Sequence, residues 1–167
     1  GKYKPTGRGK PASEYLLRTV VDGSGFPRIN NLVDIGNYIS LKYTIPLSIW
    51  DLNRANSNCF EFRLGLKQES YVFNSYGQSL QLHDLICGCS ISNRQNSTPI
   101  VNPVKDSMTT KITDSSKNIA AALYFPCKNY NEKRLHSILQ EFYQAIMTKQ
   151  NSSVGKFAII DSTSKID

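Results

Sequence analysis

The chain has 167 residues, 40% of them apolar, and carries a formal net charge of +7 at neutral pH. This length is most simply one domain with its own core, and nine Tyr and seven Phe argue against a disordered chain. The longest apolar runs fall well short of the roughly 20 residues that a membrane-spanning helix requires, so the sequence predicts no membrane partner.

The chain begins with a basic segment, residues 1–11, which is rich in Gly and Pro and is expected to be an arm or loop. Residues 1–28 contain six Lys or Arg against two acidic residues. This balance fits either a nucleic-acid partner or a solvated arm without a role, and charge alone leaves both open. A single domain is expected over residues 12–149, followed by a polar tail over residues 150–167.

Two helices are expected next, over residues 13–22 and 29–42. In the second helix, Asn30, Asp34 and Asn37 are spaced i, i+4 and i+7 and therefore point the same way. Most of the other positions are apolar, which is typical of a largely buried helix. Unpaired polar groups in such surroundings cost roughly 1–3 kcal/mol each, so this stripe must find partners or line a cavity. It is the first candidate for a functional site.

The middle of the chain predicts strands. Phe60, Phe62, Leu64 and Leu66 alternate with other residues, so residues 59–67 are expected to form a strand that buries these four. The later elements are expected in chain order as a strand at 71–73, an interior strand within 82–92, a long loop at 93–107, a strand at 108–113, and helices at 114–125 and 130–149. Helices, then strands, then helices indicate an α+β layered fold rather than alternating βαβ units.

Four cysteines and the absence of common motifs limit the chemistry. Cys87 and Cys89 fall on one face of a strand, but no Cys-x-x-Cys pair accompanies them. Buried free thiols in a cytoplasmic protein are therefore the preferred interpretation of Cys59, Cys87, Cys89 and Cys127, ahead of disulfides or a zinc site. The sequence contains no dinucleotide or P-loop fingerprint, no HExxH and no GxSxG. We therefore expect no metal and no cofactor.

Two segments carry a resemblance to a known family. Residues 27–38 (PRINNLVDIGNY) and 46–52 (PLSIWDL) resemble the B-three/B-four domain of the bacterial phenylalanyl-tRNA synthetase beta subunit. Residues 13–18 (SEYLLR) are similar to a motif of the freestanding relatives of that domain. Weaker similarity follows at residues 84–89 (DLICGC), 93–95 (NRQ) and 110–113 (TKIT). Because the family domain usually begins earlier, an N-terminal portion is expected to be missing from this chain.

The resemblance implies a three-layer β/β/α domain. In the synthetase, this domain hydrolyses tyrosine that is wrongly attached to the phenylalanine tRNA. The family's Thr-Asn pair falls on Gly36 and Asn37, and its editing His falls on Ser48. The pocket is therefore expected to be more open around Gly36, with a hydroxyl in place of the imidazole. The implied partners are tRNA or aminoacyl-tRNA, with the amino acid in the pocket.

Under this interpretation, Asn37 and Asn31 donate hydrogen bonds to the ester carbonyl or to the ribose. Asp34 pairs with the substrate ammonium group, and Ser48 positions a water molecule. The alternative is that Asp34 and Asn31 only stabilise the start of the helix. Phosphate contacts are expected from six basic residues: Lys2, Lys4, Arg8, Lys10, Arg28 and Arg94.

Three functions remain open at this point. The first is an editing domain that hydrolyses mischarged aminoacyl-tRNA in trans. The second is a non-catalytic module that binds tRNA or another RNA, which the loss of the family's His at Ser48 favours. The third is an amino-acid sensor that keeps the pocket without a nucleic-acid surface. The basic arm fits the first two functions.

Overall fold

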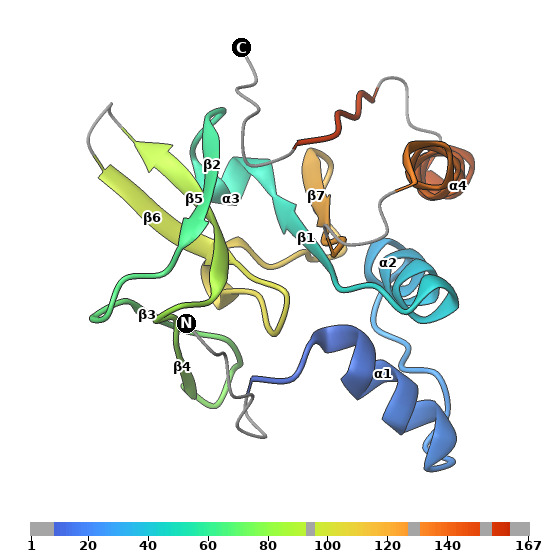
Figure 1. Cartoon of the computed structure of the whole chain (residues 1–167), viewed down its shortest axis with the longest axis horizontal. Helices are drawn as coiled ribbons and strands as arrows, with labels where there is room; N and C mark the ends of the chain where they lie inside the picture. Colours follow the sequence, from blue (N-terminus) through green and yellow to red (C-terminus); the bar gives the residue numbers. More distant parts are fainter. Residues whose placement is uncertain (1–8, 93–95, 127–130, 151–154, 161–167) are drawn as a thin grey trace. The chain divides into compact units, whose positions relative to one another are not determined.

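The computed structural model of the chain describes residues 9–92, 96–126, 131–150 and 155–160 (Figure 1). The chain divides into two compact units, Gly1–Cys127 and Lys128–Asp167. Most of the basic arm expected at residues 1–11, the expected phosphate contact Arg94 and much of the expected tail lie outside the described residues.

The described part of the first unit is built from short helices and antiparallel strands. Its elements are α1 (Ala12–Val21), α2 (Asn31–Tyr43), β1 (Leu47–Asp51), α3 (Leu52–Ala55), β2 (Phe60–Leu64), β3 (Ser70–Val72), β4 (Ser79–Gln81), β5 (Ile86–Ser92), β6 (Asn96–Val101), the 3-10 helix η1 (Met108–Thr110) and β7 (Ile119–Leu123). The strands form a β1–β7 pair, a β2–β5–β6 sheet and a β3–β4 hairpin. The predicted α+β class is confirmed.

Three layers are visible within this unit (Figure 1). The β2–β5–β6 sheet forms one layer, the β1–β7 pair forms the second, and α1 with α2 forms the third. Trp50 of β1 fills the space between the two β layers, where it packs with Ile100 and Val101 of β6 and meets the Phe60 ring edge-on at 5.5 Å. This arrangement agrees with the expected β/β/α layering.

The two N-terminal helices form where the sequence predicts them. Gly23 follows α1 with a φ of +80°, a left-handed conformation that glycine adopts without strain and that ends the helix. Asn30 precedes α2, and its side-chain oxygen accepts a hydrogen bond from the Val33 N–H at 3.0 Å. This contact satisfies one of the unpaired N–H groups at the start of the helix.

The helix expected at residues 114–125 is wrong, because this segment contains strand β7. Ala120, Ala121 and Ala122 favour a helix by intrinsic propensity, yet here they pair antiparallel with β1. Ala120 and Ala122 pack against the cluster around Trp50, where a small side chain leaves room for the indole ring. Tertiary packing therefore overrides the local helical preference.

The loop expected at residues 93–107 and the strand expected at 108–113 are also wrong in part. Residues Asn96–Val101 form β6, an edge strand, and Pro99 is tolerated there because the ladder shifts register beside Cys89. Met108–Thr110 form η1, whose start is capped by the Ser107 hydroxyl accepting from the Thr109 N–H at 3.2 Å. Strand β5 lies between β2 and β6, as its continuous apolar run predicts.

Strand β2 does not bury the face that the alternating pattern predicts. Phe62, Leu64 and Leu66 are exposed, and only Phe60 of the four packs against the Trp50 cluster. On the opposite face, the side chain of Arg63 is three-quarters buried. The prediction is wrong for these residues, and β2 is an edge strand, which has a neighbouring strand on one side alone within the described sheet.

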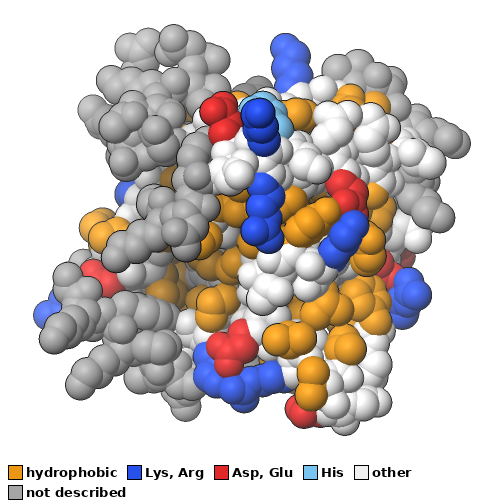
Figure 2. Space-filling model, turned by 45° about the vertical axis from the view of Figure 1, so that its right-hand side comes forward, with side chains coloured by type: hydrophobic (Ala, Val, Ile, Leu, Met, Phe, Trp, Pro, Cys, Tyr) orange, Lys and Arg blue, Asp and Glu red, His pale blue; other side chains and the backbone are white. Residues whose placement is uncertain are grey.

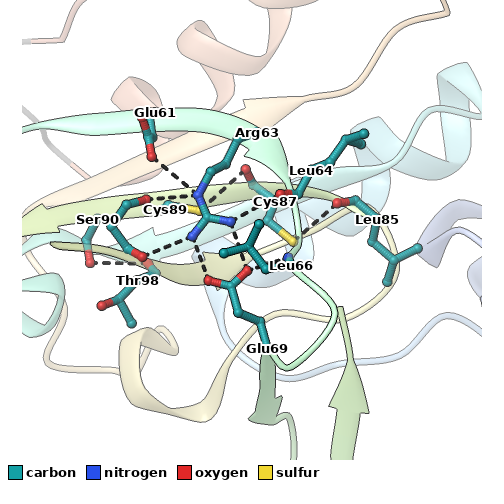
Figure 3. A network of polar contacts seen from close by, with 11 residues as sticks. Glu61, Arg63, Leu64, Leu66, Glu69, Leu85, Cys87, Cys89, Ser90 and Thr98 are labelled. Atoms are coloured by element: carbon teal, nitrogen blue, oxygen red, sulfur yellow. Dashed lines mark hydrogen bonds and ion pairs between the residues drawn. The ribbon is translucent and has the colours of Figure 1, made fainter. Parts of the chain in front are cut away.

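Arg63 is the centre of a polar network that joins three segments (Figure 3). Its guanidinium donates to both carboxylate oxygens of Glu69, at 2.7 and 2.8 Å, in a bidentate pair. It also donates to the Ser97 hydroxyl and carbonyl at 3.1 and 3.0 Å. Glu69 in turn accepts from the Leu66 N–H at 2.7 Å. The network ties β2 to β6 and to the turn before β3.

The second unit contains α4 (Glu132–Gln150), the long helix that the sequence predicts near this end. Leu135, Ile138 and Phe142 recur along one side of it at helical spacing. Phe157 meets the Tyr143 ring at 6.3 Å and the His136 ring at 6.0 Å, both edge-on. None of the described helices is long and apolar enough to cross a membrane.

The prediction of buried free thiols is confirmed for Cys87 and Cys89 and is wrong for Cys59, whose thiol is free but whose side chain is exposed. Cys127 lies outside the described residues. Burial raises the pKa of Cys87 to about 12, so this residue remains a protonated thiol at neutral pH. Among the described residues, no cluster of three His, Cys, Asp or Glu is placed to hold a metal ion.

We predict that Glu69→Gln lowers the free energy of unfolding by about 2–4 kcal/mol, because it leaves the Arg63 charge without its partner. The hydrogen bonds from Arg63 hold the pKa of Glu69 below its usual value. The stabilisation is therefore complete above about pH 4.3 and is lost as the pH falls through the folded-state pKa of Glu69. Urea unfolding of both proteins between pH 3 and pH 7 measures the difference.

The matched control is Glu61→Gln, since Glu61 lies on the same network at 3.3 Å from Arg63 but has a more exposed side chain. It should change stability by no more than about 1 kcal/mol. Equal losses in both variants, or a Glu69→Gln loss that persists unchanged at pH 3, would contradict the assigned role of Glu69.

Candidate functional site

The polar stripe of α2 is divided between local structural contacts and one unengaged amide. Asn30 caps the helix through the Val33 N–H. Asp34 accepts a hydrogen bond from the Ile29 N–H at 2.8 Å and lies 3.7 Å from the Arg28 guanidinium, so it closes the turn before the helix. The half-buried side chain of Asn37 makes no hydrogen bond to any described residue. Asn37 is thus the member of the stripe that is available to a ligand.

The space beside Gly36 is filled rather than open. A Cβ atom added at Gly36 would come within 2.6 Å of Ile49 Cδ1 and 3.0 Å of Leu47 Cδ2. Both side chains come from β1, which packs directly under this turn of α2. The expectation of a more open pocket around Gly36 is therefore wrong, because β1 residues occupy the volume that a larger residue would use.

Ser48 lies on the other side of β1, in a cluster of polar groups. The residue is 1% exposed, and its hydroxyl donates to Asp106 Oδ1 at 2.7 Å, with the Asn102 carbonyl at 3.2 Å as a further acceptor. The Tyr124 hydroxyl donates to Ser48 Oγ at 3.2 Å. We call Ser48, Asn102, Asp106, Tyr124 and Tyr71 the Ser48 cluster.

Asn102 and Tyr71 extend this cluster into the loop that follows β6. The Asn102 amide nitrogen contacts the Tyr71 hydroxyl at 2.5 Å, and Asn102 Oδ1 accepts from the Val104 and Lys105 N–H groups at 2.7 and 2.9 Å. The Tyr71 hydroxyl donates to the Lys105 carbonyl at 2.6 Å. The side chain of Asn102 therefore fixes the turn that carries Asp106.

The cluster carries one group that can change charge near neutral pH. Burial raises the pKa of Asp106 to about 7, against the opposing effect of its hydrogen bond from Ser48. Burial and the nearby Asp106 carboxylate also raise the pKa of Tyr124, which therefore remains a neutral phenol. A carboxyl group with such a pKa can accept or release a proton under physiological conditions.

The structure does not bring Ser48 together with the α2 residues of the predicted site. Successive side chains of a strand point to opposite faces, and Leu47 and Ile49 face Gly36. Ser48 accordingly faces the β2–β5–β6 sheet, where its neighbours on β1 and β7 pack around Trp50. Asn31 is exposed at the first position of α2 and has no side-chain hydrogen bond to the described residues.

Asp51, at the end of β1, is fully occupied by structural contacts. Its Oδ1 accepts from the Asn53 and Arg54 N–H groups at 2.8 and 3.1 Å and so caps α3. Its Oδ2 accepts from the Ser116 hydroxyl at 2.6 Å, and this bond is the main reason that its pKa is lowered. Asp51 thus joins α3 to the loop before β7.

The basic residues expected to contact phosphates are dispersed where they can be seen. Lys10 pairs with Glu14 at 2.9 Å, while Arg28 is largely exposed and stacks over the Phe26 ring at 5.4 Å. On the face shown in Figure 2, Lys and Arg side chains lie scattered among apolar ones without forming one continuous basic patch. Lys2, Lys4, Arg8 and Arg94 lie outside the described residues.

A separate open cavity of about 470 Å³ lies on the far side of the β2–β5–β6 sheet. It is lined by Arg63, Leu66, Glu69, Ser92, Asn96, Ser97 and Thr98. Of the residues proposed from the sequence, none that the structure describes lines it. Its charged groups, Arg63 and Glu69, are already bonded to each other, which makes it a weak candidate for ligand binding.

The sequence did not reveal the partners of Ser48. Lys105, Asp106 and Ser107 have the composition of an ordinary turn, and the helix that the sequence predicts around Tyr124 does not form. The one signal in the sequence is an acidic residue placed between Val104 and Ser107, both of which the structure shows to be buried. That signal is too weak to identify a cluster without the β1–β7 pairing.

Comparison with known proteins places these features in a family. The family model of the B3/4 domain matches residues 5–144, so the chain belongs to the B3/4 domain family. A segment of 57 residues is 42% identical to the phenylalanine–tRNA ligase beta subunit of Oceanobacillus iheyensis. That segment is 34% of this chain but only 7% of the relative, so the similarity is to one part of a much longer protein.

We predict that Asp106→Asn removes a pH dependence of stability. Because burial raises the pKa of Asp106 to about 7, the folded protein binds more protons than the unfolded chain between about pH 4 and pH 7. The contribution of Asp106 to the free energy of unfolding should therefore fall over that interval as pH rises. The asparagine keeps an acceptor for Ser48 but cannot titrate, so its stability relative to wild type should rise from pH 5 to pH 8 in urea unfolding.

Asp114→Asn is the control, since Asp114 is exposed and makes no side-chain hydrogen bond or ion pair with the described residues. Its stability difference from wild type should stay constant over the same pH range. A constant difference for Asp106→Asn as well would show that Asp106 is ionised in the folded protein throughout.

Proposed function

We propose that this protein is a cytoplasmic, trans-acting domain that binds aminoacyl-tRNA and hydrolyses the ester of mischarged molecules. Membership of the B3/4 domain family and the similarity to a phenylalanine–tRNA ligase beta subunit support a role connected with tRNA aminoacylation. The proposed substrate is the aminoacyl end of a tRNA, with the amino acid held by the protein, and the reaction needs no cofactor.

The observation that carries the proposal is the unengaged side chain of Asn37. It is half buried on α2 and bonded to no described residue, while Asp34 on the same stripe is committed to the turn. A partly desolvated amide without a protein partner gains most when a ligand supplies one. Asn37 is also the position onto which the family's Asn falls by sequence resemblance.

The chemistry is within reach of such a site. Water attacks the ester carbonyl carbon, the bond to the ribose oxygen breaks, and the products are the amino acid and a tRNA with a free terminal hydroxyl. Asn37 Nδ2 would donate to the oxygen on which negative charge develops. The terminal ribose hydroxyl can assist the proton transfer, so a strong protein base is not required. Asn31, which is exposed at the start of α2, would contact the ribose under this proposal.

A second candidate function is non-catalytic binding of tRNA or another RNA. The observation that favours it is the state of Ser48, at the family's His position. Its hydroxyl is buried and committed to Asp106, so it is poorly placed to position an attacking water. Under this alternative, Asn37 would bind the RNA end without accelerating any reaction.

A deacylation assay distinguishes the two functions. Purified protein is mixed with a panel of labelled aminoacyl-tRNAs that includes tyrosyl-tRNA(Phe), and ester loss is followed against buffer. Hydrolysis of one member that falls about 100-fold or more in Asn37→Ala is the expected result, because a preorganised donor to an oxyanion typically contributes that much. Gln68→Ala, which removes an exposed amide from a turn, should leave the rate unchanged.

The catalytic proposal would be contradicted if no aminoacyl-tRNA were hydrolysed. Measurable binding of uncharged tRNA in the same experiment would then support a non-catalytic binding module. Hydrolysis that survives Asn37→Ala would retain the activity but remove Asn37 from it. Ser48→Ala should have a small effect on the rate, since the Ser48 hydroxyl is not accessible to substrate.

Binding to tRNA should depend on salt through the basic arm. Replacement of Lys2, Lys4 and Arg8 by Ala is expected to reduce the slope of log affinity against log salt concentration by about 2, because three phosphate contacts would no longer release counterions. Filter binding or fluorescence anisotropy over a salt series measures the slope. As a charge-matched control, the exposed residues Lys67, Lys117 and Lys133 are replaced by Ala, and the slope should change much less. Absence of tRNA binding at low salt would favour an amino-acid sensor.

A further inference from the structure

Strand β2 exposes one edge of the β2–β5–β6 sheet. The Ile91 N–H bonds to the Cys59 carbonyl, and the Gly65 N–H bonds to the Leu85 carbonyl. The backbone N–H and C=O groups of the odd-numbered residues of β2 therefore point toward β5. The N–H and C=O groups of the alternate residues Phe60 and Phe62 must then point away from the sheet. They have no partner within the described part of the chain.

The exposed edge is flanked by apolar side chains. Phe62 is 39% exposed and Leu64 is 56% exposed, and Ile86, opposite Leu64 on β5, is 50% exposed. Apolar side chains beside unpaired backbone groups are the features that let an edge strand accept another strand. Proteins usually protect such an edge, so its exposure here indicates that another strand pairs with it.

The charged side chains of β2 are complementary to those of a second, antiparallel copy of β2, which makes a second copy of this protein the expected partner of the exposed edge. An antiparallel partner can bond the outward groups only in registers that pair even-numbered residues. With Phe62 opposite Phe62 of the second copy, each Glu61 faces an Arg63 and each Phe60 faces a Leu64. A shift of two positions either way instead places Glu61 against Glu61 or Arg63 against Arg63, which is destabilising.

We propose that two copies of this protein associate through β2, with a two-fold axis at Phe62, to form a continuous six-stranded antiparallel sheet. The contact is self-complementary, as a two-fold interface must be. Each Arg63 is then flanked by Glu69 and Glu61 of its own chain and by Glu61 of the second copy. One five-residue strand per copy gives a small contact, so the dimer should be transient, with a dissociation constant in the micromolar range.

Sedimentation equilibrium of the full chain over a concentration series tests the proposal. The wild type should show a monomer–dimer equilibrium, and Glu61→Lys should weaken it by about tenfold or more, because two attractive pairs become repulsive at once. The Glu61 side chain is 43% exposed, so this variant is expected to fold. Glu132→Lys makes the same change of charge on α4 and should leave the equilibrium unchanged.

Disulfide trapping tests the register independently. In a background with Cys59 and Cys127 changed to Ser, Phe62→Cys should form a disulfide-linked dimer under mild oxidation, since the two-fold axis brings the introduced thiols face to face. Leu64→Cys should not, because Leu64 is opposite Phe60 in this register. A wild type that remains monomeric at about 0.5 mM overturns the proposal. A dimer that is insensitive to Glu61→Lys, or that is trapped at position 64 instead, overturns it equally.

Discussion

The antiparallel pairing of β1 with β7 determines where the candidate site residues point. It sets Ser48 opposite Ala122 and carries the chain to Tyr124, whose N–H bonds to the Pro46 carbonyl at 3.0 Å. One face of the pair therefore presents Ser48 and Trp50 to the sheet, and the other presents Leu47 and Ile49 to α2. A slip of one residue would exchange the two faces and bury the wrong set. The three-layer arrangement depends on this register.

The two faces of the β1–β7 pair are packed differently, with apolar side chains toward α2 and a buried polar cluster toward the sheet. Toward α2, Gly36 allows the helix to approach so closely that the side chains of Ile49 and Leu47 fill the gap. Toward the sheet, a hydroxyl and a carboxyl group are buried beside the Trp50 cluster and must satisfy one another. Asn37 and Ser48, which the family resemblance places in one pocket, are thereby separated into an accessible amide and an enclosed hydroxyl.

The sequence predicted those features that depend on local pattern. Helices α1, α2 and α4 follow from apolar spacing, and the run around Cys87 identified the central strand β5. The sequence prediction failed where tertiary packing determines the structure. Ala120 to Ala122 favour a helix but lie in a strand, where Ala120 and Ala122 give Trp50 the small neighbours that it needs. Asn37 was identifiable from its place on the helix, whereas Asp106 was not, since its importance comes from Ser48, which is 58 positions away in the sequence.

The near-neutral pKa of Asp106 is compatible with a stable cluster because Ser48 has two acceptors. When Asp106 is ionised, the Ser48 hydroxyl donates to it at 2.7 Å and accepts from Tyr124. When Asp106 is protonated, the same hydroxyl can donate to the Asn102 carbonyl at 3.2 Å. The Ser48 hydroxyl therefore has an acceptor whether Asp106 is ionised or protonated. The free-energy cost of changing the protonation state of Asp106 arises mainly from the carboxyl group itself. The carbonyl of Asn102 thus makes a titratable group tolerable beside the core.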